Sequence, residues 1–254
     1  MGGKARATAA WDVGAVMERL RAMGDPELVK GMERFGVDGG RALGIRVPPL
    51  RALSKEIGRD HALALGLWAT GVHEARILTP MVAEVGRTTE AQADAWVVDI
   101  DAWDICDGLC FELLRYAPFA HSKALEWAGR EEEYVKRAGF ALMAGLAIKD
   151  KGAPDAAFLP FLEAVEREAD DDRNFVRKAV NWALRQIGKR DAALNRRALE
   201  VARQLKARDS RAARWVGSDA ARELASEAVQ RRLRERKSRS VKGGAAKRRR
   251  ARRA

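Results

Sequence analysis

Apolar residues recur along this chain at the three- and four-residue spacing of an amphipathic helix, in one short segment after another. Alternating apolar and polar positions, which would predict strands, are almost absent, and alanine, leucine, arginine and glutamate are abundant. The spacing predicts helices over Trp11–Met23, Pro49–Ile57, His61–Trp68, Glu74–Val85, Ala91–Trp96, Trp103–Arg115, Ser122–Ala128, Tyr134–Ala147, Phe158–Ala169, Phe175–Ile187, Leu194–Leu205 and Trp215–Glu223. Short breaks separate these segments, so we predict an all-α chain with tight loops.

Part of this helical pattern is repeated. The segment Y-V-K-R-A at Tyr134–Ala138 aligns with F-V-R-K-A at Phe175–Ala179 at an offset of 41 residues, and Trp215-Val216 begins a weaker third copy. A period near 40 residues with two helices in each copy is typical of HEAT-like repeats. We therefore predict a HEAT-like repeat solenoid, an α-α superhelix in which one helix of each pair lines a concave face.

Both clear copies carry a basic pair after the valine, Lys136-Arg137 and Arg177-Lys178. If these pairs lie on the inner helices, they give the concave face a positive charge suited to nucleic acid. An ordinary solvated helix surface would explain the same pairs equally well.

The net charge of +12 is concentrated at the C-terminus. Residues 231–254 contain 13 of the 48 basic residues and one of the 36 acidic residues, which leaves 35 of each kind in the rest of the chain. We predict a helical repeat domain over residues 1–230 and a basic tail without ordered structure over residues 231–254. The tail would attract phosphate non-specifically, or would simply improve solubility.

The two cysteines, Cys106 and Cys110, are too few for a disulfide framework and predict small buried side chains in a reducing compartment. No histidine lies near them, so we predict no metal site. No apolar run reaches the length of a membrane span, and the N-terminal residues lack the pattern of a signal peptide. We expect a cytoplasmic protein without membrane contact.

The segment D-A-W-D-I-C-D at Asp101–Asp107 carries the most informative chemistry. In a helix, Trp103 and Asp107 point to the same side, and an aromatic face beside a carboxylate can hold a cation or a sugar that becomes cationic. A core tryptophan with a solvated aspartate is the alternative on spacing alone. Asp101 is predicted to be the N-cap of this helix. Asp104 points about 100° away and is the second-choice carboxylate.

Four segments in this order resemble the AlkD-like DNA glycosylases of the DNA alkylation repair family, across about Val29–Leu224. They are A-L-G-I-R-V-P-P-L-R at Ala42–Arg51, W-D-I-C-D at Trp103–Asp107, Y-V-K-R-A at Tyr134–Ala138, and N-F-V-R-K-A-V-N-W-A-L-R at Asn174–Arg185. The chain departs from some members in having Ala102 before the tryptophan and Tyr134 near the arginine.

The resemblance implies a HEAT-like fold and a set of site residues. It implies that Asp107 is the catalytic carboxylate, that Trp103 and Trp182 enclose the lesion, and that Arg137 holds a phosphate. Lys178, in the register of Arg137, and Arg185 are predicted to bind DNA as well. No metal or organic cofactor is needed for this chemistry. The pair His73-Glu74 is too little to supply the ligands of a di-iron site.

The implied function is a DNA repair glycosylase that hydrolyses the N-glycosidic bond of cationic N3- or N7-alkylated purines in double-stranded DNA, without flipping the base into a pocket. We expect a nucleoid-associated monomer. Some sub-branches of the family keep the fold without base excision, so the alternative is a catalytically silent HEAT-like protein that binds distorted or branched DNA. A scaffold for protein partners is a third possibility, and the repeated basic pairs argue against it.

Overall fold

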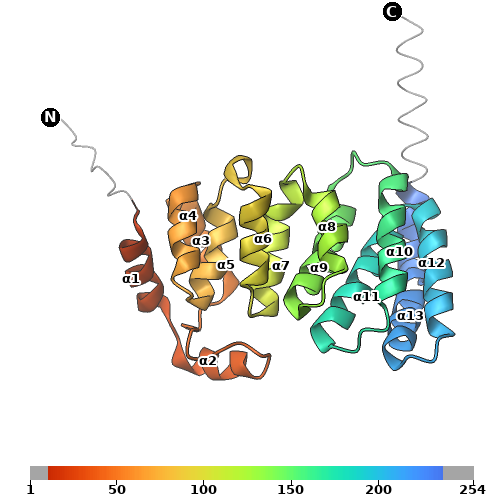
Figure 1. The fold of residues 1–254 in the computed structure, drawn as a ribbon, viewed down its shortest axis with the longest axis horizontal. Coiled ribbons are helices and arrows are strands. Elements are labelled where there is room, and N and C mark those ends of the chain that lie inside the picture. The colour runs from red at the N-terminus through yellow and green to blue at the C-terminus, as the bar shows by residue number, and fades with distance from the viewer. Residues whose placement is uncertain (1–10, 237–254) are drawn as a thin grey trace, which may run out of the picture. The chain divides into compact units, whose positions relative to one another are not determined.

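The computed structural model describes residues 11–236, and within this range every regular element is helical. Figure 1 shows the helices in chain order. The all-α prediction is therefore confirmed for the part of the chain that is described. The chain forms two compact units, which divide between Ala117 and Pro118.

The first unit ends at Ala117 and contains seven α-helices and two short 3₁₀ turns among its described residues. The helices are α1 Val13–Met23, α2 Pro26–Glu33, α3 Val47–Ile57, α4 His61–Ala69, α5 His73–Val82, α6 Glu90–Val98 and α7 Trp103–Glu112, with 3₁₀ turns at Val85–Arg87 and Leu114–Tyr116. Side chains of Asp12, Asp25, Asp60 and Thr89 accept backbone N–H groups at the starts of α1, α2, α4 and α6.

Helix α2 was absent from the sequence prediction because it is only eight residues long and its three apolar residues, Leu28, Val29 and Met32, are only half-buried. Its start is nevertheless visible in the sequence as Asp25 followed by Pro26, an N-cap and a proline at the first helical position. At the centre of the unit, α5 packs against α3, α4 and α7 and buries nearly all of its residues. Three of those buried side chains are charged or titratable, and they prove to organise the site.

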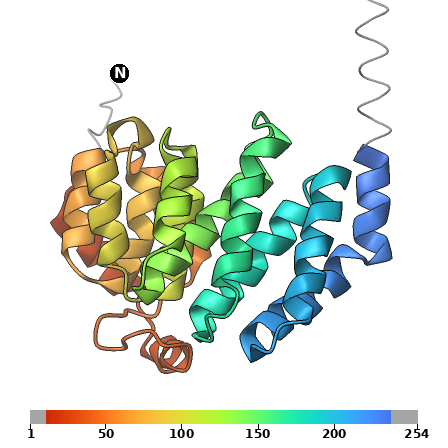
Figure 2. The same cartoon turned by 45° about the vertical axis from the view of Figure 1, so that its right-hand side comes forward.

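The second unit begins at Pro118 and repeats pairs of helices. Its elements are α8 Ala120–Ala128, α9 Glu133–Lys149, a 3₁₀ turn at Asp155–Phe158, α10 Leu159–Glu168, α11 Asn174–Gly188, α12 Ala192–Lys206 and α13 Arg211–Leu224. Helix α11 packs along α9, and α13 packs against both α11 and α12. Figures 1 and 2 both show α11, α12 and α13 as neighbours.

Helices α12 and α13 approach each other closely because Gly217 has no side chain. A Cβ at this position would lie 2.4 Å from the carbonyl oxygen of Ala202 and 2.5 Å from the backbone nitrogen of Lys206. Gly139 permits the same close approach of α9 to α8, where a Cβ would lie 2.4 Å from the backbone nitrogen of Ala128.

A further helix over residues 227–236 follows α13. Val229 and Leu233 are buried on it, and the Arg236 guanidinium donates to the carbonyl oxygens of Lys189 and Arg190 at 3.1 and 3.0 Å. The boundary predicted at residue 231 is therefore too early, because two apolar anchors and a capping arginine hold this segment. The remainder of the predicted tail, residues 237–254, lies outside the described residues.

Candidate functional site

Trp103 is the first residue of α7, and Asp107 lies one turn later on the same helix. Both side chains are half-buried, whereas the core-facing side of α7 is formed by Ile105, Cys106, Leu109 and Cys110. The pair therefore lies at the edge of the buried face, where an aromatic ring and a carboxylate can meet a ligand. Cys106 and Cys110 are free buried thiols, as predicted.

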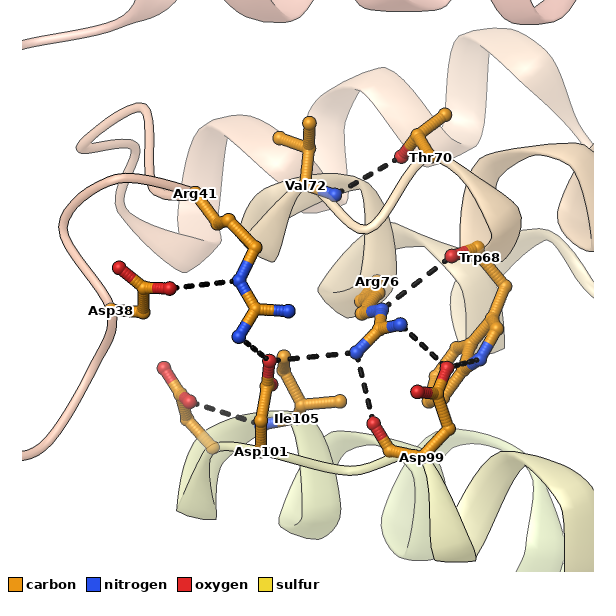
Figure 3. Close-up of polar contacts among 10 residues, drawn as sticks. Asp38, Arg41, Trp68, Thr70, Val72, Arg76, Asp99, Asp101 and Ile105 are labelled. Atoms are coloured by element: carbon orange, nitrogen blue, oxygen red, sulfur yellow. Dashed lines mark hydrogen bonds and ion pairs between the residues drawn. The ribbon is translucent and has the colours of Figure 1, made fainter.

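The backbone before α7 is fixed by ion pairs rather than by an N-cap. The cap position is Ala102, and no side chain bonds to the first turn there, so the prediction that Asp101 caps the helix is wrong. The carboxylate of Asp101 instead lies 2.8 Å from Arg41 and 3.6 Å from Arg76 (Figure 3). Two guanidinium groups thus compete successfully with the weaker backbone N–H donors.

Arg76 is the centre of this arrangement and is buried. It donates to the side chain of Asp99 at 2.5 Å and to the backbone oxygen of Asp99 at 2.9 Å. Its guanidinium carbon lies 5.0 Å from the centre of the Trp68 ring, and the Trp68 indole donates to Asp99 at 3.0 Å (Figure 3). These contacts hold residues 99–102, and through them the start of α7, against α5.

His73 holds the first turn of α7 directly, with Nε2 at 3.0 Å from Oδ2 of Asp104. Burial alone would lower the pKa of His73, but the hydrogen bond that His73 donates to Asp104 and the charges of Asp104, Glu74 and Asp101 outweigh it and raise the pKa. Asp104 therefore has a structural partner on α5.

Sequence reasoning missed the role of Glu74. This fully buried carboxylate accepts the backbone N–H groups of Leu43, Gly44 and Ile45 at 2.8, 2.8 and 3.1 Å. Gly44 has a φ of 79°, which favours glycine, and a Cβ there would lie 2.0 Å from the Asp25 carbonyl oxygen. The L-G-I segment thus forms a carboxylate-binding turn, a signal that could have predicted a buried acidic partner. Among residues 11–236, no group of three or more potential ligands could hold a metal ion.

In the second unit, the basic pair Lys136-Arg137 is buried rather than exposed. Lys136 lies 2.8 Å from Glu168 and 3.6 Å from Asp171, and Arg137 donates to the backbone oxygen of Phe175 at 2.8 Å. Burial would raise the pKa of Glu168, but hydrogen bonds from Lys136 and Arg167 lower it. The pair is therefore not an ordinary solvated helix surface, and the charge of Lys136 is compensated by acidic residues of the neighbouring repeat.

The predicted site residues of α11 differ in their exposure and in their ion pairs. Lys178 is exposed, and Trp182 follows one turn later and is half-buried. Arg185 lies 2.6 Å from Glu223 and 3.5 Å from Asp219 of α13, so carboxylates compensate its charge. Burial opposes ionisation of Glu223, yet contacts with Lys189 and Arg185 lower its pKa. Roles of Arg137, Lys178, Trp182 and Arg185 in DNA binding remain predictions.

Two comparisons relate this chain to known proteins. A solved structure described as "A new family of proteins related to the HEAT-like repeat DNA glycosylases with affinity for branched DNA structures" is similar to this chain with a TM-score of 0.71, at 21% identity, over 84% of this chain and 95% of that chain. The predicted HEAT-like repeat fold is thereby confirmed.

The family model for "DNA alkylation repair enzyme" matches residues 16–224, and the chain belongs to this family. A comparison with curated proteins found no match. Within residues 11–236, no helix combines the length and the apolar character needed to cross a bilayer.

Proposed function

We propose that this protein is a DNA glycosylase that removes cationic N3- or N7-alkylated purines from double-stranded DNA. The observation that carries the proposal is the placement of Trp103 and Asp107 one turn apart at the edge of α7, on a helix start braced by buried ion pairs. Membership of the DNA alkylation repair family supports it.

This reaction needs few catalytic groups from the protein. An alkylated purine already carries a positive charge, so it leaves as a neutral base with the electron pair of the C1′–N bond. The sugar becomes cationic, and a water molecule adds to C1′ and releases a proton. A carboxylate stabilises that cation and orients the water, and Asp107 is the group on α7 that we assign to this role.

The tryptophans would also stabilise the positive charge electrostatically. The negative face of an indole attracts a cation, and the attraction grows as the sugar gains charge in the transition state. We assign Trp103 and Trp182 to the sugar and backbone of the lesion, and the exposed Lys178 to a phosphate beside it. Two further carboxylates of α7 are paired within the protein, Asp104 with His73 and Glu112 with Arg51.

A second candidate function is catalytically silent binding of branched DNA. The similar solved structure belongs to proteins described as having affinity for branched DNA, and this favours the alternative. The two functions separate in one assay, in which wild-type protein at saturating concentration is incubated with duplex DNA containing 7-methylguanine. Release of free 7-methylguanine supports the glycosylase. Binding without release, with a preference for a branched over a linear duplex, supports the silent binder and would overturn our proposal.

A further inference from the structure

Helices α9, α11 and α13 each carry an aromatic residue near their start, at Tyr134, Phe175 and Trp215. The rings of Tyr134 and Phe175 are 5.7 Å apart. The Arg177 guanidinium carbon lies 4.9 Å from the centre of the Trp215 ring. Trp215 differs from its two counterparts because it is exposed, with 39% of its surface accessible. An exposed tryptophan beside an arginine therefore ends the row.

Lys136, the cation at the start of α9, has two acidic partners, and the equivalent positions of the third copy are not acidic. Glu168 and Asp171, which bind Lys136, precede Phe175 by seven and four residues. The positions seven and four residues before Trp215 are Arg208 and Arg211. Two carboxylates are thus exchanged for two arginines in the next copy of the repeat.

This exchange leaves the cation of the second copy without a counter-ion. Arg177 aligns with Lys136, and no described residue forms an ion pair or hydrogen bond with its side chain. Its Nε atom is buried and has no hydrogen-bond partner among the described residues. A buried donor without an acceptor is costly, so this geometry favours an external anion.

Arg211 adds a second available cation one turn before Trp215. It is exposed, and within residues 11–236 nothing pairs with it, whereas Arg208 is bonded to Asp170 at 3.0 Å. The exposed loop residues Asp172 and Asp209 form no ion pair with Arg177 or Arg211 in the described chain. Two cations and an aromatic face therefore lie together without a carboxylate between them.

The cluster adjoins the part of α11 that carries the predicted site. Asn181 and Arg185 of α11 contact Asp219 of α13, and these contacts fix how the two helices align. Next to that seam, Arg211, Trp215, Ser218 and Arg222 form an exposed stripe on α13 at helical spacing. On α11, Lys178 and Trp182 occupy the corresponding stripe.

We propose that Arg177, Arg211 and Trp215 form a contact for a DNA strand one repeat beyond Trp182, in which the arginines bind a backbone phosphate and the indole packs against a deoxyribose or a base. Arginine pairs suit phosphate because their donors bond to two of its oxygens at once. Aromatic faces stack on sugars and bases without regard to sequence. The proposal rests on the DNA binding of the proposed function but needs no base release.

The decisive variant is Arg211→Asp, which restores a carboxylate at the position of Asp171. The new aspartate removes one cation and pairs with Arg177, so the phosphate contact is lost. Binding to an undamaged duplex then weakens about tenfold or more, and the slope of log K against log salt falls by about one. The fold gains an ion pair and an acidic residue in the first turn of α13, so the melting temperature stays equal or rises. The matched control is Arg203→Asp, an exposed cation of α12 with the same change of charge.

Trp215→Ala separates stacking from charge. It weakens binding about fivefold or more without changing the salt slope, because it removes an aromatic contact and no cation. Binding is compared on a blunt duplex and on a duplex with a single-stranded branch. If the variant binds both DNAs more weakly than the wild type, the indole packs against a deoxyribose. If only binding to the branched DNA weakens, the indole stacks on an unpaired base.

Several results would overturn this assignment. Arg211→Asp with the affinity and slope of Arg203→Asp would show that no phosphate binds there, as would Trp215→Ala with wild-type affinity on both DNAs. Base release at saturating protein should be the same in all three variants as in the wild type. A wild-type protein that releases no base would therefore contradict only the proposed function. Wild-type protein that binds no DNA at low salt would overturn both.

Discussion

The two units use buried charge for different purposes. In the first unit, His73, Glu74 and Arg76 follow one another at the start of α5 and bind three different segments, namely α7, the L-G-I turn and the loop before α7. In the second unit, Lys136 and Arg185 each join one inner helix to acidic residues of the neighbouring repeat. The first arrangement positions the start of α7, which carries the candidate site, whereas the second neutralises charge between neighbouring repeats.

This difference teaches how to interpret basic residues in a helical repeat. A lysine or arginine on an inner helix is available to DNA only if the next copy lacks a carboxylate at the facing position. Lys136 forms an ion pair with Glu168, whereas Arg177 has no carboxylate partner among residues 11–236 and is available to an external anion. The pattern of acidic residues therefore decides which members of a basic row can bind phosphate.

The largest effect on stability should come from Glu74→Gln. In the wild type, three backbone N–H groups share the Glu74 carboxylate. The amide of the variant turns N–H groups toward them, so at least one backbone donor loses its acceptor. The free energy of unfolding therefore falls by about 3 kcal/mol. Urea denaturation measures the loss, and Glu18→Gln, on the exposed side of α1, provides the control. A loss equal to the control would show that the turn at Gly44 does not depend on the buried charge.

Lys136→Met should have the next largest effect. Glu168 then keeps only Arg167 as a cationic partner, so the free energy of unfolding falls by about 2 kcal/mol. This loss is smaller than the loss expected when a buried ion has no other partner. The double variant Lys136→Met with Glu168→Leu should regain most of the loss. The salt slope of DNA binding should equal that of the wild type, and a slope reduced by about one would show that Lys136 does contact phosphate.

His73→Gln should have a smaller effect that depends on pH. The pKa of His73 is raised in the folded protein, so its stabilising charge is fully present below its ordinary pKa of 6.5 and is lost as pH rises through the raised value. The difference in unfolding free energy between wild type and variant should therefore be larger at pH 5.5 than at pH 9. Asp104→Asn should give the same profile, and a difference independent of pH would rule out the ion pair.

Periodicity and repeats were sufficient to predict the all-α fold and most of its helices, because those helices bury an apolar stripe. They failed for α2, whose apolar residues are only half-buried, and for residues 227–236, whose two apolar anchors, Val229 and Leu233, are obscured by surrounding arginines. Helical spacing also placed Trp103 and Asp107 one turn apart on α7. Local patterns are thus reliable where one helix alone determines the outcome.

Partners distant in sequence could not be predicted in this way. Asp101 lies at a position that favours an N-cap, yet Arg41 and Arg76 take its carboxylate. Lys136 and Arg137 look like a basic surface in the sequence, yet acidic and backbone groups from the next repeat bury them. These outcomes depend on which segments the fold brings together, and one segment of sequence does not contain that information.

The most direct test of the account compares Asp107→Asn with Asp104→Asn in single-turnover release of 7-methylguanine from duplex DNA at saturating protein. If Asp107 stabilises the cationic sugar, Asp107→Asn lowers the rate by about 10² to 10³ while undamaged DNA still binds. Asp104→Asn, which disturbs the contacts of Asp104 with His73 and with the backbone N–H of Ile105, should lower it much less. A near wild-type rate for Asp107→Asn, with the large loss in Asp104→Asn instead, would contradict the assignment of the catalytic carboxylate.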